Sequence, residues 1–196
     1  MPKISTYIPS QKLLAIIAGL LIVITGVYVG MLTFAPQLPN IPLVSQSPLA
    51  IRASDDATDN RNRIVIPKID LEVPYFTGDT EATLDKGAWH RKPEQGNPVI
   101  GGNFILSAHR FELGLTPART KAKSPFYNID KLQKGDEIKI FFEGKWYSYN
   151  VTKKYDVPPT ALYIERQSAE PKLTLYSCSL QGAAVGRSVI EATPAF

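Results

Sequence analysis

The chain has 196 residues, of which 44% are hydrophobic, and a formal net charge of +4. This length allows one domain of about 100–200 residues with accessory segments. The charge is too small to indicate nucleic-acid binding, and the single cysteine and two histidines do not have the spacing of a zinc site. The sequence therefore predicts no nucleic-acid partner, no metal and no cofactor.

The first element is an apolar segment long enough to cross a membrane. Residues 13–32 carry no charge, and twenty helical residues at about 1.5 Å each span roughly 30 Å, the thickness of the bilayer core. Two lysines precede this segment, and the next basic residue is Arg52. The positive-inside rule then predicts a cytoplasmic N-terminus (1–12), a single-pass anchor (13–34) and an extracellular remainder. A cleaved signal peptide is the alternative, although its apolar region is usually about 7–15 residues.

Residues 35–60 are predicted to be a linker. They hold four prolines, which discourage helix and favour extended chain. The segment ends in a polar stretch without apolar periodicity, so it would let a folded domain stand off the membrane. An ordered arm over residues 43–52 is the alternative. The remaining domain is predicted to cover residues 61–196.

The pattern of this domain is one of short strands with two short helices. A helix over 81–86 is predicted between Thr80 as its cap and Gly87, and another over 126–132 because Ser124-Pro125 precedes it. Glu143-Gly144 is a two-residue hairpin turn. The predicted strands cover residues 63–67, 102–109, 137–142, 145–151, 172–178 and 187–192. Many short strands with few helices predict a mainly β fold, as a sandwich or a closed barrel.

Three residues with catalytic chemistry lie at the predicted ends of strands: His109, Cys178 and Arg187. A lone cysteine outside the membrane has no disulfide partner, which favours a reactive thiol or an intermolecular bridge, and a nearby cation stabilises the thiolate. Histidine can exchange a proton with the thiol or with a leaving amine, and arginine can donate to an oxyanion. On neighbouring strands the three would support acyl transfer. A buried structural cysteine is the alternative.

The segments around these residues resemble the motifs of the sortases, the cysteine transpeptidases of Gram-positive cell surfaces. Thr174-Leu175-Tyr176-Ser177-Cys178 is similar to the family's TLxTC, with serine in place of the usual threonine. Ala108-His109-Arg110 resembles the family's Gly-His-Arg, and Gly186-Arg187 stands where the family has its arginine. The resemblance covers roughly residues 61–196 and implies an eight-stranded sortase β-barrel.

The resemblance also implies a reaction on a sorting signal of LPxTG type. Cys178 would attack the carbonyl of the threonine–glycine bond to form a thioester, and His109 would protonate the departing amine. An amine nucleophile would then resolve the thioester. Arg187 would position the substrate and stabilise the oxyanion, while Ser177 and Ala108 are the predicted substrate-binding residues.

The implied partners are surface proteins with a C-terminal sorting signal and an amine from a peptidoglycan precursor or a pilin lysine. The N-terminal helix implies a place in the cell membrane with the catalytic domain outside. No second apolar span and no Asp-Pro-aromatic lid motif is evident in the sequence, which favours the anchoring of surface proteins to the cell wall. A pilin-polymerising sortase, a cysteine protease or hydrolase that releases the free acid, and a non-catalytic binding module are the alternatives.

Other polar residues have simpler interpretations. His90 has loop-like flanks and is predicted to be structural or exposed, and Ser107 is predicted to be a strand residue. Arg119, Lys121 and Lys123 form a basic segment, which is a solvated loop or, alternatively, a contact to an anionic polymer or lipid head group.

Overall fold

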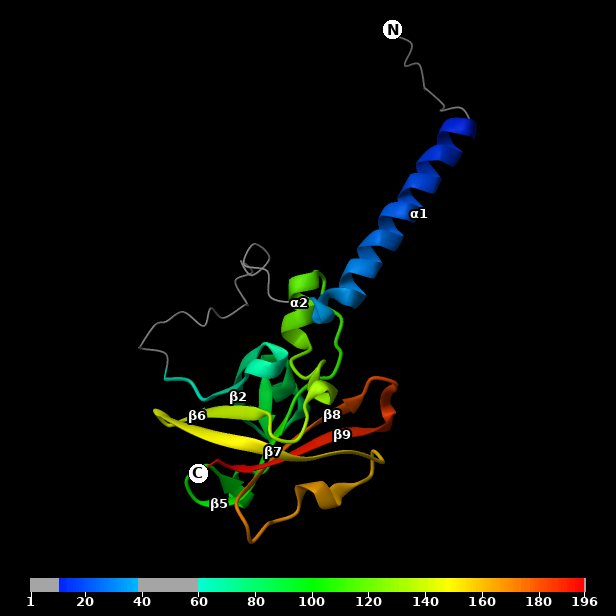
Figure 1. Ribbon diagram of the computed structural model, residues 1–196. Helices are drawn as coiled ribbons and strands as arrows, with labels where there is room; N and C mark the ends of the chain where they lie inside the picture. Colours follow the sequence, from blue (N-terminus) through cyan, green and yellow to red (C-terminus); the bar gives the residue numbers. More distant parts are fainter. Residues whose placement is uncertain (1–10, 39–59, 196) are drawn as a thin grey trace.

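The computed structural model of the protein describes residues 11–38 and 60–195. A long helix, α1 (Gln11–Phe34), projects from a β-barrel and ends in a 3-10 turn, η1 (Ala35–Gln37) (Figure 1). Among the described residues, Gln11–Gln37 is the one helical segment whose length and apolar composition suit a membrane span. The predicted cytoplasmic end up to residue 10 and the predicted arm over 43–52 lie outside the described residues.

The domain is a closed barrel of eight strands, as predicted. The strands follow one another around the ring in the order β3-β2-β1-β6-β7-β9-β8-β5, and β3 pairs with β5 to close it. A ninth, two-residue strand, β4, pairs only with the first two residues of β5. The bounds are β1 Arg63–Ile66, β2 Leu71–Thr77, β3 Ala88–His90, β4 Gly96–Asn97, β5 Gly101–Ser107, β6 Glu137–Phe142, β7 Lys145–Val157, β8 Lys172–Ser179 and β9 Gly182–Pro194.

Strand ends differ from the sequence-based expectations at three places near the predicted site. β5 ends at Ser107, so His109 lies two residues beyond the strand. β7 continues to Val157 through a register shift between Val151 and Lys153. β9 begins at Gly182, so Arg187 lies within the strand and does not open it. The predicted turn is present, since Glu143 and Gly144 both have positive φ, as a type I′ hairpin requires.

The helices of the domain are short. η3 (Glu81–Lys86) has the predicted extent but is a 3-10 helix, and the Thr80 side chain does not cap it. The predicted helix over 126–132 is wrong, because a turn and the 3-10 helix η5 (Ile129–Lys131) occupy those residues. The other 3-10 helices are η2 Pro67–Ile69, η4 Pro93–Gln95 and η6 Leu162–Glu165.

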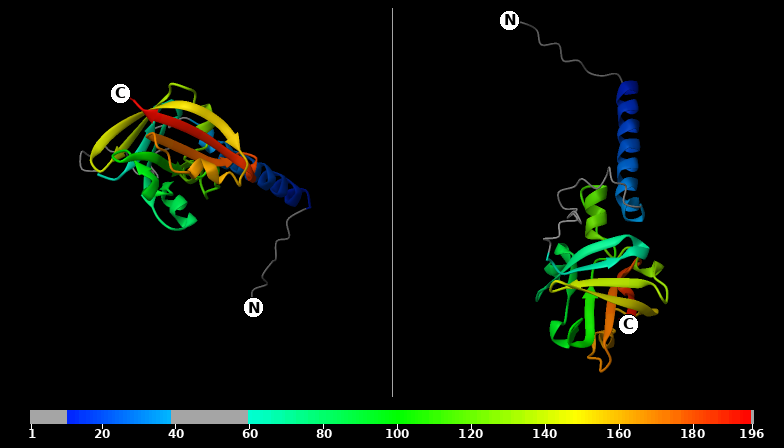
Figure 2. Two further views of the ribbon diagram at one scale, coloured as in Figure 1. Left: turned by 90° about the horizontal axis from the view of Figure 1, so that it is seen from below. Right: turned by 60° about the vertical axis from the view of Figure 1, so that its left-hand side comes forward.

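An α-helix that the sequence analysis missed, α2 (Pro117–Lys123), forms just upstream. The Thr116 hydroxyl accepts a hydrogen bond from the backbone N–H of Arg119 at 3.2 Å, and proline occupies the first turn. Figures 1 and 2 show α2 beside the end of α1 that is nearer the barrel. The buried Ala35 and Pro36 lie at this junction, so the first residues of the predicted linker pack on the domain.

The barrel has two apolar clusters because side chains alternate across each strand. The interior cluster includes Leu173 and Leu175 of β8. The second cluster lies on the outer face of the wall, where Tyr176 of β8 and Val189 of β9 pack with Ile164 from the β7–β8 connection. Each large apolar side chain that is fully buried contributes about 1.5–3 kcal/mol. The wall formed by β5, β8 and β9 is therefore covered on both faces, which gives a rigid base for residues at its end.

Candidate active site

The strand register brings the three predicted catalytic residues to one level of the barrel wall. β8 lies between β5 and β9. Cys178 of β8 is directly opposite Arg187 of β9. β5 runs parallel to β8 with Ser107 opposite Tyr176, and two further residues along each chain bring His109 to the level of Cys178. Cys178 therefore has Arg187 as its direct neighbour on one side, and the course of β5 leads the chain towards His109 on the other.

Alternation along the strands places the thiol and the guanidinium on the outer face. Tyr176 belongs to the outer cluster, and Cys178 follows it by two residues. Val189 belongs to the same cluster, and Arg187 precedes it by two residues. Cys178 is half-buried, and the side chain of His109 is 28% exposed. These groups are accessible to a substrate yet partly withdrawn from water.

Arg187 is held by its own strand. Its Nη1 donates to the carbonyl oxygens of Ala183 at 2.7 Å and Gly186 at 3.1 Å. A guanidinium has five N–H donors, so Nε and Nη2 still offer donors to a substrate. A side chain at Gly186 would place its Cβ 2.7 Å from the carbonyl oxygen of Val157, so glycine permits the close approach of β9 to the end of β7 beside this arginine.

His109 faces an acidic residue that the sequence analysis missed. The Oδ1 of Asp85, in η3, is 3.9 Å from His109 Nε2. The two groups form an ion pair when the imidazole is protonated. On the backbone side, the carbonyl of His109 accepts a hydrogen bond from the N–H of Phe126 at 3.2 Å. Asp85 carries no local sequence signal, because it lies 24 residues before the histidine and meets it only through the fold.

The β7–β8 connection, residues 158–171, is fixed to the wall by a buried amide. Asn103 of β5 is fully buried, and its Nδ2 donates to the carbonyls of Ile164 at 3.1 Å and Arg166 at 2.8 Å. The hydroxyl of Thr174 donates to Asn103 Oδ1 at 2.7 Å. The amide thus ties the connection to the two strands that lead towards His109 and Cys178.

A second polar group anchors the same connection. Glu165 pairs with Arg91, with 2.9 Å between Oε1 and Nε, and accepts a hydrogen bond from the hydroxyl of Tyr176. Burial, together with this carboxylate, raises the pKa of Tyr176. The tyrosine therefore stays protonated and keeps donating to Glu165. This hydrogen bond attaches the connection to β8 at Tyr176, two residues before Cys178.

The two predicted substrate-binding residues are buried. Ser177 is 2% exposed, and its hydroxyl donates to the carbonyl of Cys178 at 3.3 Å. Ala108 is 3% exposed and belongs to the interior cluster. Neither side chain is therefore exposed on the outer face, where alternation places the thiol and the guanidinium.

The other histidine and the arginine after His109 are both buried. His90 is on β3 and not in a loop, and its Nε2 lies 3.1 Å from the carbonyl oxygen of Gly96. Burial lowers its pKa below the ordinary 6.5 despite that carbonyl, so the ring is neutral near pH 7. Arg110 is 4% exposed and pairs with Asp130 at 2.8 Å between Nη2 and Oδ1. Both side chains therefore have a structural role in the barrel.

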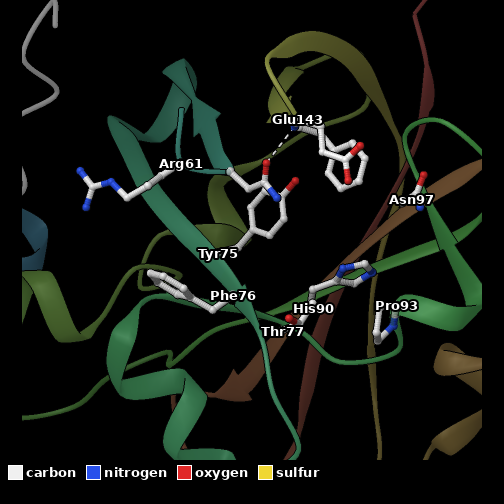
Figure 3. A pocket seen from close by; sticks show the side chains of 10 residues that line it. Arg61, Tyr75, Phe76, Thr77, His90, Pro93, Asn97 and Glu143 are labelled. Carbon is white, nitrogen blue, oxygen red and sulfur yellow. Dashed lines mark hydrogen bonds between the residues drawn. The ribbon is translucent and has the colours of Figure 1, made fainter. Parts of the chain in front are cut away.

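Cys178 does not line either of two cavities in the domain. One of about 580 Å³ lies where β7 begins, at the end of the barrel opposite Arg187, and His90 and Tyr75 line it (Figure 3). Another of about 400 Å³ is lined by Arg110 and Asp130 and by the turn after β8. Within residues 11–38 and 60–195, no three His, Cys, Asp or Glu side chains gather as metal ligands do.

Comparison with known proteins agrees with this fold. Residues 64–195 match the family model described as the sortase domain. Sortase A of Bacillus anthracis is 32% identical over 127 residues, which are 64% of this chain and 55% of that protein. The chain belongs to the sortase family, and it spans about half the length of the curated relatives that it matches.

Solved structures show the same barrel. A Clostridium perfringens sortase D5 transpeptidase is 26% identical with a TM-score of 0.58, over 69% of this chain and 79% of that one. Sortase C1 of GBS Pilus Island 1 is 26% identical with a TM-score of 0.59, over 69% and 64% of the two chains. These similar structures carry different sortase class letters, so the likeness does not by itself select a class.

Proposed function

We propose that this protein is a cysteine transpeptidase with Cys178 as nucleophile, His109 as acid and base, and Arg187 as the oxyanion donor. One observation carries the proposal: Cys178 and Arg187 are direct partners across β8 and β9, and the β5 register leads His109 to the same level. A thiol, an imidazole and a guanidinium at one accessible end of a rigid wall supply the groups that acyl transfer needs.

The reaction proceeds in two halves. The thiolate of Cys178 attacks the threonine carbonyl of an LPxTG-like signal, and Arg187 donates N–H groups to the oxyanion. The tetrahedral centre collapses, the carbon–nitrogen bond breaks, and His109 gives its proton to the departing glycine amine. An incoming amine then attacks the thioester, His109 accepts the proton, and the Cys178 thiolate leaves.

The proposed setting is the outer surface of a membrane. Residues 13–34 would form the anchor, with residues 1–12 in the cytoplasm, residues 35–60 as the linker and the catalytic domain, 61–196, outside. The substrates would be surface proteins that carry a C-terminal sorting signal. The amine would come from a peptidoglycan precursor, which anchors the product to the cell wall, or from a pilin lysine.

The nature of the product tests this function. Full-length protein in detergent is incubated with an LPxTG-type peptide, with and without a glycine oligomer or a lysine-containing peptide as amine. A transpeptidase gives the ligated product, and the preferred amine identifies the class. Release of the free acid alone, unchanged by either amine, would make the protein a hydrolase. Cys178→Ala is the control that shows whether either product depends on the thiol.

A further inference from the structure

Exposed apolar side chains lie on a segment that reaches the long helix at Leu115. They belong to the segment that joins His109 to α2: Phe111 is 37% exposed, Leu113 53% and Leu115 76%. The hydroxyl of Tyr28, on α1, donates to the carbonyl of Leu115. Leu115 therefore adjoins the apolar surface of α1, and Phe111, whose ring packs against Tyr127, and Leu113 precede it in the chain.

The contact with Tyr28 sets the depth of this segment along α1. Tyr28 lies six residues before Phe34, which is about 9 Å along a helix axis. Leu115 thus reaches back beside the apolar run, past the point where α1 ends. Tyrosines of membrane-spanning helices gather at the level of the lipid head groups. If α1 spans a bilayer, Leu115 lies at that level too.

The helix that follows adds positive charge at the same place. Three basic residues lie on α2: Arg119 is exposed, Lys123 is half-buried, and the Nζ of Lys121 donates to the carbonyl of Leu38 at 2.8 Å. Glu112 is the single acidic residue between 111 and 129. Apolar side chains flanked by basic ones are the composition that binds the interface of an anionic membrane.

Further hydrogen bonds hold the domain in this pose. Gln37 Nε2 donates to the hydroxyl of Tyr127 at 3.0 Å, and Asn128 Nδ2 donates to the carbonyl of Pro36 at 3.4 Å. Together with the bonds to Tyr28 and Lys121, they fasten the end of α1 to the 115–128 region. The domain would then not swing freely about the end of the anchor.

We propose that residues 111–123 form a membrane-docking face, whose leucines and Phe111 enter the bilayer interface while its basic side chains contact anionic lipid head groups. The inference rests on the proposed membrane anchor. His109 is six residues from Leu115, which an extended chain spans in about 20 Å. The docking face therefore holds the active site close to the bilayer surface.

Two leucines provide a matched test of this docking. Leu115 is 76% exposed and Leu162, in η6, is 75% exposed, but η6 lies at the end of the molecule away from α1 (Figure 1). Leu115→Cys and Leu162→Cys are each made in full-length Cys178→Ala protein, labelled with an environment-sensitive fluorophore and reconstituted in vesicles that contain a nitroxide-labelled lipid. We expect the probe at 115 to be blue-shifted and quenched several-fold more than the probe at 162. Equal, water-like signals at both positions would overturn the docking.

A third probe separates failure of the docking from failure of the anchor. Leu20→Cys places the label in the middle of α1. Quenching at 20 without quenching at 115 overturns the docking face and leaves the anchor intact. No quenching at 20 overturns the anchor and the docking with it. Peptide ligation by the unlabelled wild type reports on catalysis independently of both.

The lipid charge is tested in the same format. With the probe at 115, vesicles that contain phosphatidylglycerol should quench more than neutral vesicles. Arg119→Glu with Lys123→Glu should abolish that increment, whereas the same reversal at the exposed Lys134 and Lys145 should leave it. An increment that survives the first pair, or is lost equally with the second, would show that these basic residues do not contact lipid.

Discussion

Each residue of the proposed triad owes its role to its neighbours in the fold. Cys178 and Arg187 become partners through the β8–β9 ladder, and His109 joins them because β5 runs parallel to β8. The sequence motifs identify the three residues, but not the carboxylate of Asp85 at 3.9 Å from the imidazole. A residue type that occurs once, such as the cysteine, is easily recognised in a sequence. Asp85 is one of eighteen acidic residues, and nothing in its local sequence distinguishes it from the others.

The two histidines should behave differently when each is replaced. His109→Ala should lower the rate of peptide transfer by about 10²–10⁴, because acid and base groups contribute that much. His90→Ala should leave the rate per folded molecule nearly unchanged while lowering stability, because His90 is buried and packs edge-on against Phe104. Steady-state kinetics with thermal unfolding of each variant make the comparison. The reverse ranking would move the site to β3.

Arg187→Lys should keep the charge but lose the planar set of donors. We expect acylation by a sorting-signal peptide to slow by about 10²–10³, the usual cost of one oxyanion donor. Alkylation of Cys178 by a small reagent should change little, since it needs no oxyanion donor. If alkylation falls as steeply as acylation, Arg187 acts on the thiolate. If neither rate changes, Arg187 lies outside the site.

At the scale of elements, the buried amide of Asn103 holds the β7–β8 connection in place. Asn103→Asp keeps the acceptor for Thr174 but removes the donors to the carbonyls of Ile164 and Arg166. Leaving such buried groups unpaired costs about 1–3 kcal/mol. We expect lower stability in urea and a higher KM for the peptide.

Asn97→Asp is the matched control for this change. Asn97 uses only its Oδ1, which accepts from the N–H groups of Val99 and Ile100, and aspartate preserves that role. This variant should unfold and turn over peptide like the wild type. A KM that Asn103→Asp leaves unchanged would mean that the connection does not help to bind the peptide.

The local pattern of apolar residues predicts some strands well. It fails where a proline interrupts a strand or where pairing with a distant strand determines the structure. Strands over 137–142 and 172–178 match β6 and β8 to within a residue, because their apolar residues are continuous or alternate. β2 was missed because Pro74 interrupts it. The proline is tolerated because β3 begins to pair with β2 only at Tyr75, so no ladder bond to β3 needs its N–H.

The helix near residue 120 shows a second limit. Thr116-Pro117 and Ser124-Pro125 carry the same start signal, and only the first opens an α-helix. After Ser124 the apolar residues Phe126, Ile129 and Leu132 are drawn into the barrel interior, where all three are fully buried. Packing of those side chains, and not local propensity, decides between a helix and a series of turns.

At the scale of the whole molecule, the closed barrel could be predicted through the family resemblance. The packing of α1 against the catalytic domain could not. The contact between Tyr28 and Leu115 joins residues 87 positions apart. Contacts of that kind leave no periodic trace in either segment. The basic residues of α2 were noticed in the sequence, but their place beside the anchor comes only from the fold.

The orientation of the anchor can be tested on cells. Protease added to intact cells or protoplasts should release a fragment that begins between residues 39 and 60, because the positive-inside rule places the domain outside. N-terminal sequencing of the fragment and immunoblotting of the membrane fraction provide the readout. Complete protection of the domain, with cleavage only after the membrane is permeabilised, would reverse the orientation.

The most direct test of the account is whether Cys178 carries the acyl group. Full-length protein is mixed with an LPxTG-type peptide, quenched with acid, digested and analysed by mass spectrometry. We predict that the fragment with Cys178 gains the mass of the peptide up to its threonine, and that the adduct disappears when hydroxylamine or an acceptor amine is added before the quench. Product formation by Cys178→Ala at a comparable rate, or an acyl group on any other residue, would contradict the mechanism.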